Sequence, residues 1–237
     1  MRPKRFLVPV VSLLILATWA QAQSGPPTIC KPCLFYSGDL SPSDLYAEAF
    51  ENENTLSLSA GTYGAIRVPY KHTVLVEGVL FQTIVEFGDR LDPDLAEYQI
   101  RTNIVGTGGT LIAGGAGPAY HQPTGRQFNG NPEYTIAVQV NPPVQLSGGD
   151  TYPGTEYWFN LVPFCTLHHD PTCQTVRYFV SNTAWQVNNY NLSFGVPDST
   201  VFIWPNFDYD YSLCYDEGYN GQQCAFISFG LMGKVLQ

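Results

Sequence analysis

The densest group of side chains that could do chemistry lies in the segment FDYDYSLCYDEGYNGQQC, residues 207–224. It combines tyrosines with carboxylates, and two cysteines bound its second half. A tyrosine ring offers a flat apolar face and a polar hydroxyl group, while carboxylate and amide oxygens accept hydrogen bonds. This mixture suits a carbohydrate, whose rings can stack on aromatic faces and whose hydroxyl groups can donate hydrogen bonds.

Periodicity divides this segment into two parts. If residues 207–211 form a strand, Phe207, Tyr209 and Tyr211 share one face, and Asp208 and Asp210 share the other. The aromatic side chains would then pack in a core, and the carboxylates would lie in solvent. The loop between the two cysteines is less constrained, so we expect exposed side chains there. Its candidate ligand-binding residues are Tyr215, Asp216, Glu217, Tyr219 and Asn220.

The same acids leave an enzymatic alternative open. Glycoside hydrolysis needs two carboxyl groups that face each other across roughly 5–10 Å. The acids that could supply such a pair are Asp208, Asp210, Asp216 and Glu217. The sequence has no G-x-S-x-G nucleophile elbow and no phosphate-binding loop. We therefore predict a non-catalytic protein with no catalytic residues, and we keep a glycan-active hydrolase as the alternative.

A second cluster of reactive side chains is CTLHHDPTC, residues 165–173. Two cysteines, two histidines and an aspartate so close together resemble a compact zinc set. The adjacent His168 and His169 cannot easily both turn toward one ion that Cys165 and Cys173 also bind. Export would favour oxidation of the two thiols, so we predict a hairpin tip closed by a disulfide.

A third group of possible ligands is ENENTL, residues 51–56. Its carboxylate and carboxamide oxygens suit Ca²⁺, which takes 6–8 oxygen ligands. The alternative is local turn and cap bonding by the same side chains. We predict no cofactor, with a structural calcium ion as the alternative. The calcium ligands would be Glu51, Asn52, Glu53 and Asn54.

The six cysteines of the chain predict disulfide bonds, because an even number in an exported protein favours pairing. Short spacings predict local pairs, which are Cys30–Cys33, Cys165–Cys173 and Cys214–Cys224. The first pair forms a C-x-x-C motif. As a redox motif it would need a thioredoxin-like setting with a helix N-terminus, which the sequence around it does not predict. We expect a structural disulfide there.

The N-terminus predicts export. Arg2, Lys4 and Arg5 precede an apolar run, and Ala20-Gln21-Ala22 matches a small-x-small cleavage site. This is the pattern of a secretory signal peptide covering residues 1–22. We expect a secreted protein, extracellular or periplasmic, and we find no second apolar span that predicts a membrane segment in the mature chain.

The charge balance excludes one class of partner. The chain has 20 acidic and 11 basic residues, and its net charge is −9. Phosphate binding needs clustered lysine and arginine, so we predict no nucleic-acid partner and no anionic membrane surface.

The elements that must position these residues are almost all strands. Short apolar or alternating runs predict strands at residues 55–59, 64–68, 73–81, 97–102, 110–113, 133–140, 156–162, 176–181, 201–204 and 225–231. The turns expected between them include GTGG, GGAGP, NGNP and GGDTYPG. A short helical turn is expected at residues 42–50. This pattern predicts one antiparallel β-sandwich, of jelly-roll topology, over residues 46–237, after a Pro/Gly/Ser-rich lead-in segment at residues 23–45.

Alternation also predicts which side chains face the core. In residues 133–140, those expected inside are Tyr134, Ile136, Val138 and Val140, and those expected outside are Thr135, Ala137 and Gln139. In residues 73–81, one face is expected to carry Val74, Val76 and Leu80, and the other Leu75, Val79 and Phe81. Residues 156–162 are apolar on both faces and suit an inner strand.

Several of these pieces occur together in one known family. They are ENENTLSLSAGTYGAIRVP, TVLVEGVLF, GTGGTLIAGG, PTGRQF, PEYTIAVQV, LSGGDTYPGTEYWFNLVP and FISFGLMG. In this order they resemble a family of secreted bacterial β-sandwich proteins, uncharacterised in function, some of which carry C-terminal sorting tails. The resemblance implies a fold and an export route, and it implies no reaction. The extra cysteines and the acidic tyrosine loop depart from the family pattern.

Taken together, the sequence predicts a secreted, non-catalytic β-sandwich protein that binds an extracellular polysaccharide. A structural or adhesive protein of the cell envelope or matrix is the alternative from another class.

Overall fold

The computed structural model describes residues 28–39, 50–52, 61–86, 95–104, 109–128, 130–164, 177–183, 201–203, 209–212 and 226–236. Every regular element in these ranges is a strand, and the paired strands run antiparallel. The longer strands are β3 (Gly61–Pro69), β4 (Thr73–Glu86), β5 (Leu95–Thr102), β6 (Thr110–Phe128), β7 (Asn131–Ser147), β8 (Gly154–Phe164) and β14 (Phe229–Val235). The shorter ones are β1 (Cys33–Tyr36), β2 (Phe50–Asn52), β9 (Arg177–Val180), β10 (Asn182–Thr183), β11 (Val201–Ile203), β12 (Tyr209–Ser212) and β13 (Phe226–Ile227).

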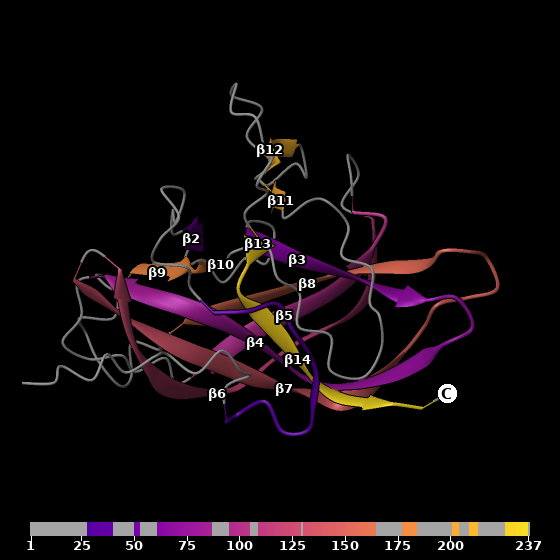
Figure 1. Cartoon of the computed structure of the whole chain (residues 1–237), viewed down its shortest axis with the longest axis horizontal. Helices are drawn as coiled ribbons and strands as arrows, with labels where there is room; N and C mark the ends of the chain where they lie inside the picture. The colour runs from indigo at the N-terminus through magenta and orange to yellow at the C-terminus, as the bar shows by residue number, and fades with distance from the viewer. Residues whose placement is uncertain are drawn as a thin grey trace, which may run out of the picture.

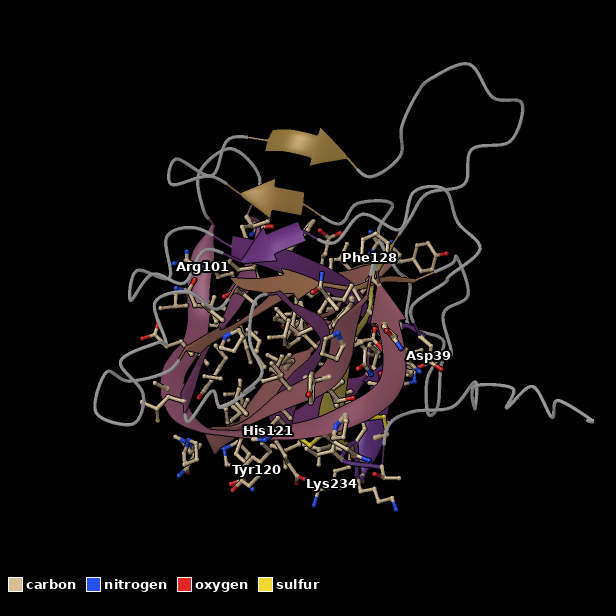
Figure 2. All side chains as sticks on the ribbon, turned by 90° about the vertical axis from the view of Figure 1, so that its left-hand side faces the viewer. Asp39, Arg101, Tyr120, His121, Phe128 and Lys234 are labelled. Carbon is tan, nitrogen blue, oxygen red and sulfur yellow. A yellow bond between two sulfur atoms is a disulfide. The ribbon has the colours of Figure 1, made fainter. Side chains whose placement is uncertain are left out.

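These strands curl into a sandwich-like half-barrel, which confirms the predicted all-β antiparallel class. The strand order is β1-β14-β4-β7-β6-β5-β8-β3-β11-β12 among the described residues, with β2 and β9 joined at one side (Figure 1). The half-barrel has two walls, one containing β14, β4 and β7 and the other containing β5, β8 and β3. β6 joins the two walls, because its first half pairs with β5 and its second half pairs with β7. Figure 2 shows β6 as a long arc that passes Tyr120 and His121 and ends at Phe128.

The core lies between the two walls. Phe229 of β14 lies at its centre, with ring centroids 5.1 Å from Phe35, 5.6 Å from Phe81 and 6.4 Å from Phe159. Phe159 belongs to β8 in the opposite wall, so these four rings join both walls. Gly64 of β3 leaves the space for this packing, because a Cβ atom there would lie 2.6 Å from the Phe229 ring.

A bulge in β4 makes the predicted two faces of this strand wrong. The pairing of β4 with β14 shifts between Met232 and Gly233, where Glu77 is one extra residue of β4. The inward face therefore changes parity along the strand. Val74 and Val76 share the core with Val79 and Phe81, and Leu80 faces outward.

In β7 the predicted core residues are confirmed. Ile136, Val138 and Val140 are buried in the core, and Tyr134 packs against it. Of the residues expected outside, Gln139 is exposed, but Thr135 and Ala137 are buried on the outer face of the sheet. The alternating pattern predicts the correct face for Thr135 and Ala137. They are nevertheless buried, because other segments of the chain cover this outer face. Residues near the N-terminus form part of that cover, since Cys30 and Tyr36 cluster with Ala137.

The remaining predictions for the elements divide as follows. Strands are found at the positions expected for 64–68, 97–102, 110–113, 133–140, 156–162, 176–181 and 201–204, with several of them longer than expected. The single strand expected at 225–231 is instead two strands, β13 and β14, with different partners. The turn expected at GGAGP is wrong, because these residues lie inside β6. The helical turn expected at residues 42–50 and the strand at 55–59 fall outside the described residues, except that Phe50 begins β2.

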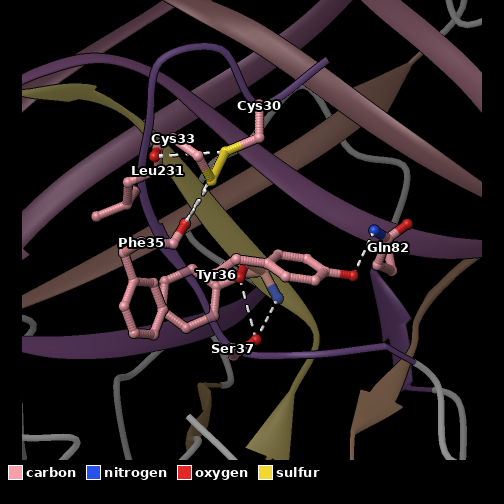
Figure 3. The surroundings of a disulfide bond; sticks show 8 residues. Cys30, Cys33, Phe35, Tyr36, Ser37, Gln82 and Leu231 are labelled. Carbon is pink, nitrogen blue, oxygen red and sulfur yellow. Dashed lines mark hydrogen bonds between the residues drawn. A yellow bond between two sulfur atoms is a disulfide. The ribbon is translucent and has the colours of Figure 1, made fainter. Parts of the chain in front are cut away.

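The predicted disulfide Cys30–Cys33 is present, and it stands beside β1 (Figure 3). The sulfur of Cys30 lies 3.6 Å from the carbonyl oxygen of Leu231, and the sulfur of Cys33 lies 3.5 Å from the carbonyl oxygen of Phe35. β1 pairs with β14, so part of the predicted lead-in segment is built into the sheet. No helix that is long and apolar enough to cross a membrane occurs among the described residues.

Candidate functional site

The tyrosine and acid loop predicted as a binding surface lies outside the described residues. This holds for Tyr215, Asp216, Glu217, Tyr219 and Asn220, and also for the cysteine pairs Cys165–Cys173 and Cys214–Cys224. Just before the loop, residues 209–212 form β12, which pairs with β11, while residues 207 and 208 fall outside the described residues. The direction of its side chains, and the loop itself, remain predictions.

The calcium ligands predicted at residues 51–54 are described only in part. Glu51 and Asn52 lie in β2, where their backbones pair with Phe179 and Tyr178 of β9. Glu53 and Asn54 fall outside the described residues. In the part of the chain that the structure describes, no group of three or more His, Cys, Asp or Glu residues could hold a metal ion.

The strongest electrostatic feature is a partly buried arginine between two carboxylates. Arg126 of β6 donates to Glu133 of β7 at 2.6 Å and lies 3.2 Å from Asp39. Thr124 also donates to the same Glu133 oxygen, at 2.8 Å. Burial alone would lower the pKa of Arg126, but the charges of Glu133 and Asp39 outweigh that effect and raise it. The guanidinium is therefore a permanent charge that compensates the fully buried Glu133 carboxylate.

A chain of side-chain hydrogen bonds extends this cluster across the outer face. Tyr36 donates to Asp39 at 2.5 Å and accepts from Gln82 at 2.9 Å, and Thr135 donates to Gln82 at 2.8 Å. Burial, together with the nearby Asp39 charge, raises the pKa of Tyr36 well above its ordinary value. Figure 3 shows the Tyr36 hydroxyl directed at Gln82. These bonds fix residues 36–39 over the sheet, so the cluster serves structure.

A second polar row crosses the outer face of the other wall. Tyr63 of β3 and Arg101 of β5 both donate to the Gln99 side-chain oxygen, at 2.7 Å and 2.5 Å. Burial raises the pKa of Tyr63 to about 12. Trp158 and Ile104 pack beside Tyr63. Tyr63, Gln99 and Trp158 are all buried, so this row is part of the packed structure as well.

An exposed site of a different kind lies where two loops meet. The β3–β4 turn, residues 70–72, and the β7–β8 loop, residues 148–153, cross between the walls at the same end of the molecule. Tyr70 donates through its backbone to Pro153 at 3.3 Å, Lys71 donates to Gly149 at 3.0 Å, and Gly148 donates to His72 at 2.8 Å. We call these two loops the two-loop corner.

The base of the two-loop corner is fixed by Tyr157 of β8. Its hydroxyl group donates to the Ser147 carbonyl at 2.8 Å and accepts from the Ser147 N–H at 3.2 Å. Lys71 takes a left-handed backbone conformation, with φ of 61°, and its ammonium group lies 4.8 Å from the centroid of the Tyr70 ring. A lysine in this conformation is uncommon, and it persists where the surroundings hold it.

On this rigid base stands Tyr152, which is 83% exposed, more than any other large hydrophobic side chain that the structure describes. Asp150 and Thr151, which precede it in the same loop, are also exposed. In the sequence, GGDTYPG predicts only a turn. The signal that could have located the site is an aromatic residue inside a Gly- and Pro-rich loop, where no core position is available for its ring.

Glycines keep the two loops in contact, and this gives a prediction. A Cβ atom at Gly148 would overlap the Pro69 carbonyl group and lie 2.8 Å from the Val68 oxygen. We expect Gly148→Ala to force the loops apart and to lower the free energy of unfolding by about 1–3 kcal/mol. Urea unfolding followed by fluorescence measures it. Gly117→Ala is the control, since a Cβ atom there meets only Val138 at 3.5 Å. Equal stability of the two variants would contradict the close contact of the loops.

Comparison of the chain with protein-family models, curated proteins and solved structures finds no match. The family resemblance seen in the sequence therefore stays a prediction, and the function must be argued from the site itself.

Proposed function

We propose that this chain is a secreted, non-catalytic binding module whose ligand is an extracellular polysaccharide. The observation that supports the proposal is the Tyr152 ring, exposed on the two-loop corner, where backbone hydrogen bonds hold both loops. A loop backbone that is already held loses little conformational entropy when a ligand stacks on its tyrosine ring, so more of the contact energy remains for binding.

The chemistry around the ring suits a sugar. The apolar face of a pyranose can stack on a tyrosine ring, while its hydroxyl groups need hydrogen-bond partners. Asp150, two residues before Tyr152, offers carboxylate oxygens, and Thr151, one residue before it, offers a hydroxyl group. All three side chains are exposed, so an extended polymer could reach them without any opening of the fold.

A non-catalytic role is favoured over a hydrolase, because several acidic side chains that the structure describes form ion pairs with arginines. Asp39 and Glu133 approach the same guanidinium group, and Glu156 forms an ion pair with Arg67 at 3.3 Å. Carboxylates that are held by arginines suit structure better than proton transfer between a general acid and a base. The four acids of the hydrolase alternative, Asp208, Asp210, Asp216 and Glu217, have no described side chains and are not part of this comparison.

The experiment is a binding panel of immobilised polysaccharides with the mature protein and its variants. We expect binding to at least one polysaccharide and a loss of affinity of about tenfold in Tyr152→Ala, because a stacking contact is removed. Tyr120→Ala is the matched control, since Tyr120 is also exposed, at 47%, but lies on β6. Its affinity should equal that of the wild type.

The outcomes separate two binding surfaces. If Tyr215→Ala and Tyr219→Ala abolish binding and Tyr152→Ala does not, the ligand binds the cysteine-bounded loop, and the two-loop corner is excluded. If no polysaccharide binds to the wild type, the proposed function is wrong.

A further inference from the structure

The β3–β4 turn, residues 70–72, carries a lysine at a position where lysine is uncommon. Lys71 has a φ angle of 61°, and Asn103 is the only other non-glycine residue with a positive φ in the part of the chain that the structure describes. Left-handed positions normally take glycine or asparagine, because a larger side chain crowds the backbone there. The backbone of the turn therefore does not explain why this residue is a lysine.

Hydrogen bonds hold the turn on both sides of Lys71. The Lys71 N–H donates to the Gly149 carbonyl of the other loop at 3.0 Å, and the His72 N–H donates to the Pro69 carbonyl at 3.0 Å. The ring nitrogen Nδ1 of His72 also lies 2.9 Å from the Tyr70 carbonyl oxygen. An uncommon backbone conformation that its surroundings maintain is typical of functional sites.

The ammonium group of Lys71 is exposed and has no carboxylate partner among the described residues. Asp150 directly follows Gly149, which accepts the Lys71 N–H, but the side chains of Lys71 and Asp150 form no ion pair. The ammonium group instead lies 4.8 Å from the centroid of the Tyr70 ring. This contact places the charge and leaves N–H donors of the ammonium group for a ligand.

The charges of the two loops favour one kind of sugar. Lys71 offers positively charged donors, and the exposed Asp150 offers acceptors. A uronic acid satisfies both, because its carboxylate can accept from Lys71 and its hydroxyl groups can donate to Asp150. A neutral sugar has no negative charge for the ammonium group. Since a hydrogen bond between charged groups is about twice as strong as a neutral one, the uronic acid gains more from Lys71.

On the basis of the proposed function, we propose that the two-loop corner binds polysaccharides that contain uronic acids, with a carboxylate on Lys71 and a sugar ring on Tyr152. The two side chains belong to segments in direct contact, because the Tyr70 N–H donates to the carbonyl of Pro153, the residue after Tyr152. The net charge of −9 repels a polyanion at long range. At physiological salt this repulsion is largely screened beyond about 8 Å, so the direct contact with Lys71 decides the affinity.

The test compares polygalacturonate with carboxyl-reduced polygalacturonate, a polymer with the same linkages and no charge. Binding of residues 23–237 is measured by isothermal titration calorimetry at about 0.15 M salt. We expect the wild type to bind polygalacturonate about tenfold or more tightly than the reduced polymer. Lys71→Met keeps the length of the side chain and removes its charge, so it should abolish this preference.

Lys31→Met is the matched control. Lys31 is also exposed, but it lies within the Cys30–Cys33 disulfide loop, outside the two-loop corner. This variant should keep the preference of the wild type. If Lys71→Met does not fold, Lys71→Gly replaces it, because glycine takes the left-handed conformation without strain. Lys71→Gly should keep the thermal midpoint of the wild type and lose the preference for polygalacturonate.

The outcomes separate the ligand class from the binding function itself. Equal affinity of the wild type for the two polymers overturns the proposal, as does a preference that the Lys71 variants keep or that Lys31→Met also loses. If the wild type binds only neutral polysaccharides, and this binding needs Tyr152, the uronic acid is wrong while the proposed function stands. If no polysaccharide binds at all, both are wrong.

Discussion

Replacing Phe229 by alanine is expected to lower the free energy of unfolding by about 3–5 kcal/mol. The Phe229 ring is 3% exposed and contacts three other phenylalanine rings, which come from both walls of the half-barrel. The lost surface burial and the cavity left behind add to each other, because rings fixed on separate strands cannot close the space. Guanidinium unfolding under oxidising conditions measures the change.

Phe128→Ala is the matched control for this substitution. Phe128 lies at the end of β6 and is half-buried, so its removal should cost about 1 kcal/mol or less. A cost for Phe229→Ala as small as that for Phe128→Ala would show that the four rings do not join the walls.

The second large effect is expected from Arg126→Leu. Glu133 is 1% exposed, and Arg126 is the charged group that compensates it. Breaking a buried pair on one side leaves an uncompensated charge, which typically costs 3–5 kcal/mol. We expect Arg126→Leu to destabilise the fold by about that amount in chemical unfolding.

Two comparisons identify the cause of that loss. Arg67→Leu removes an arginine from the partly exposed pair with Glu156 and should cost about 0–1 kcal/mol. The double variant Arg126→Leu with Glu133→Leu should recover part of the lost stability, because no charge is then left buried without a partner. If the double variant were no more stable than Arg126→Leu, the buried carboxylate would not be the source of the cost.

Strand positions could be predicted from the sequence wherever one face packs on the core and the pattern has a period of two. Residues 133–140 met this condition, and their inward face is confirmed. In β4 the bulge at Glu77, opposite β14, breaks the period, and no local signal in TVLVEGVLF marks it. In β6 the run GGAGP predicted a turn, because glycine and proline dominate turns. The structure instead uses its small residues where the strand bends from one wall to the other.

The burial of the outer strand faces and the position of the candidate site could not be predicted from the sequence, because both depend on contacts between residues far apart in the chain. Thr135 and Ala137 alternate correctly but are buried on the outer face, where Cys30 and Tyr36 form part of the cover. No periodicity in a strand reports what covers its second face. The two-loop corner is likewise made by segments that are far apart in sequence and joined by backbone hydrogen bonds, for which side-chain patterns carry no signal.

The proposal that the two-loop corner binds glycans is tested most directly by NMR of residues 23–237 with labelled tyrosine rings, during addition of the polysaccharides of the binding panel. The predicted result is that the Tyr152 ring signals shift and broaden first. The signals of Tyr36 and Tyr63 should stay unchanged, because both rings are buried, at 0% and 1% exposure. Saturable binding that leaves the Tyr152 signals unmoved would contradict the account.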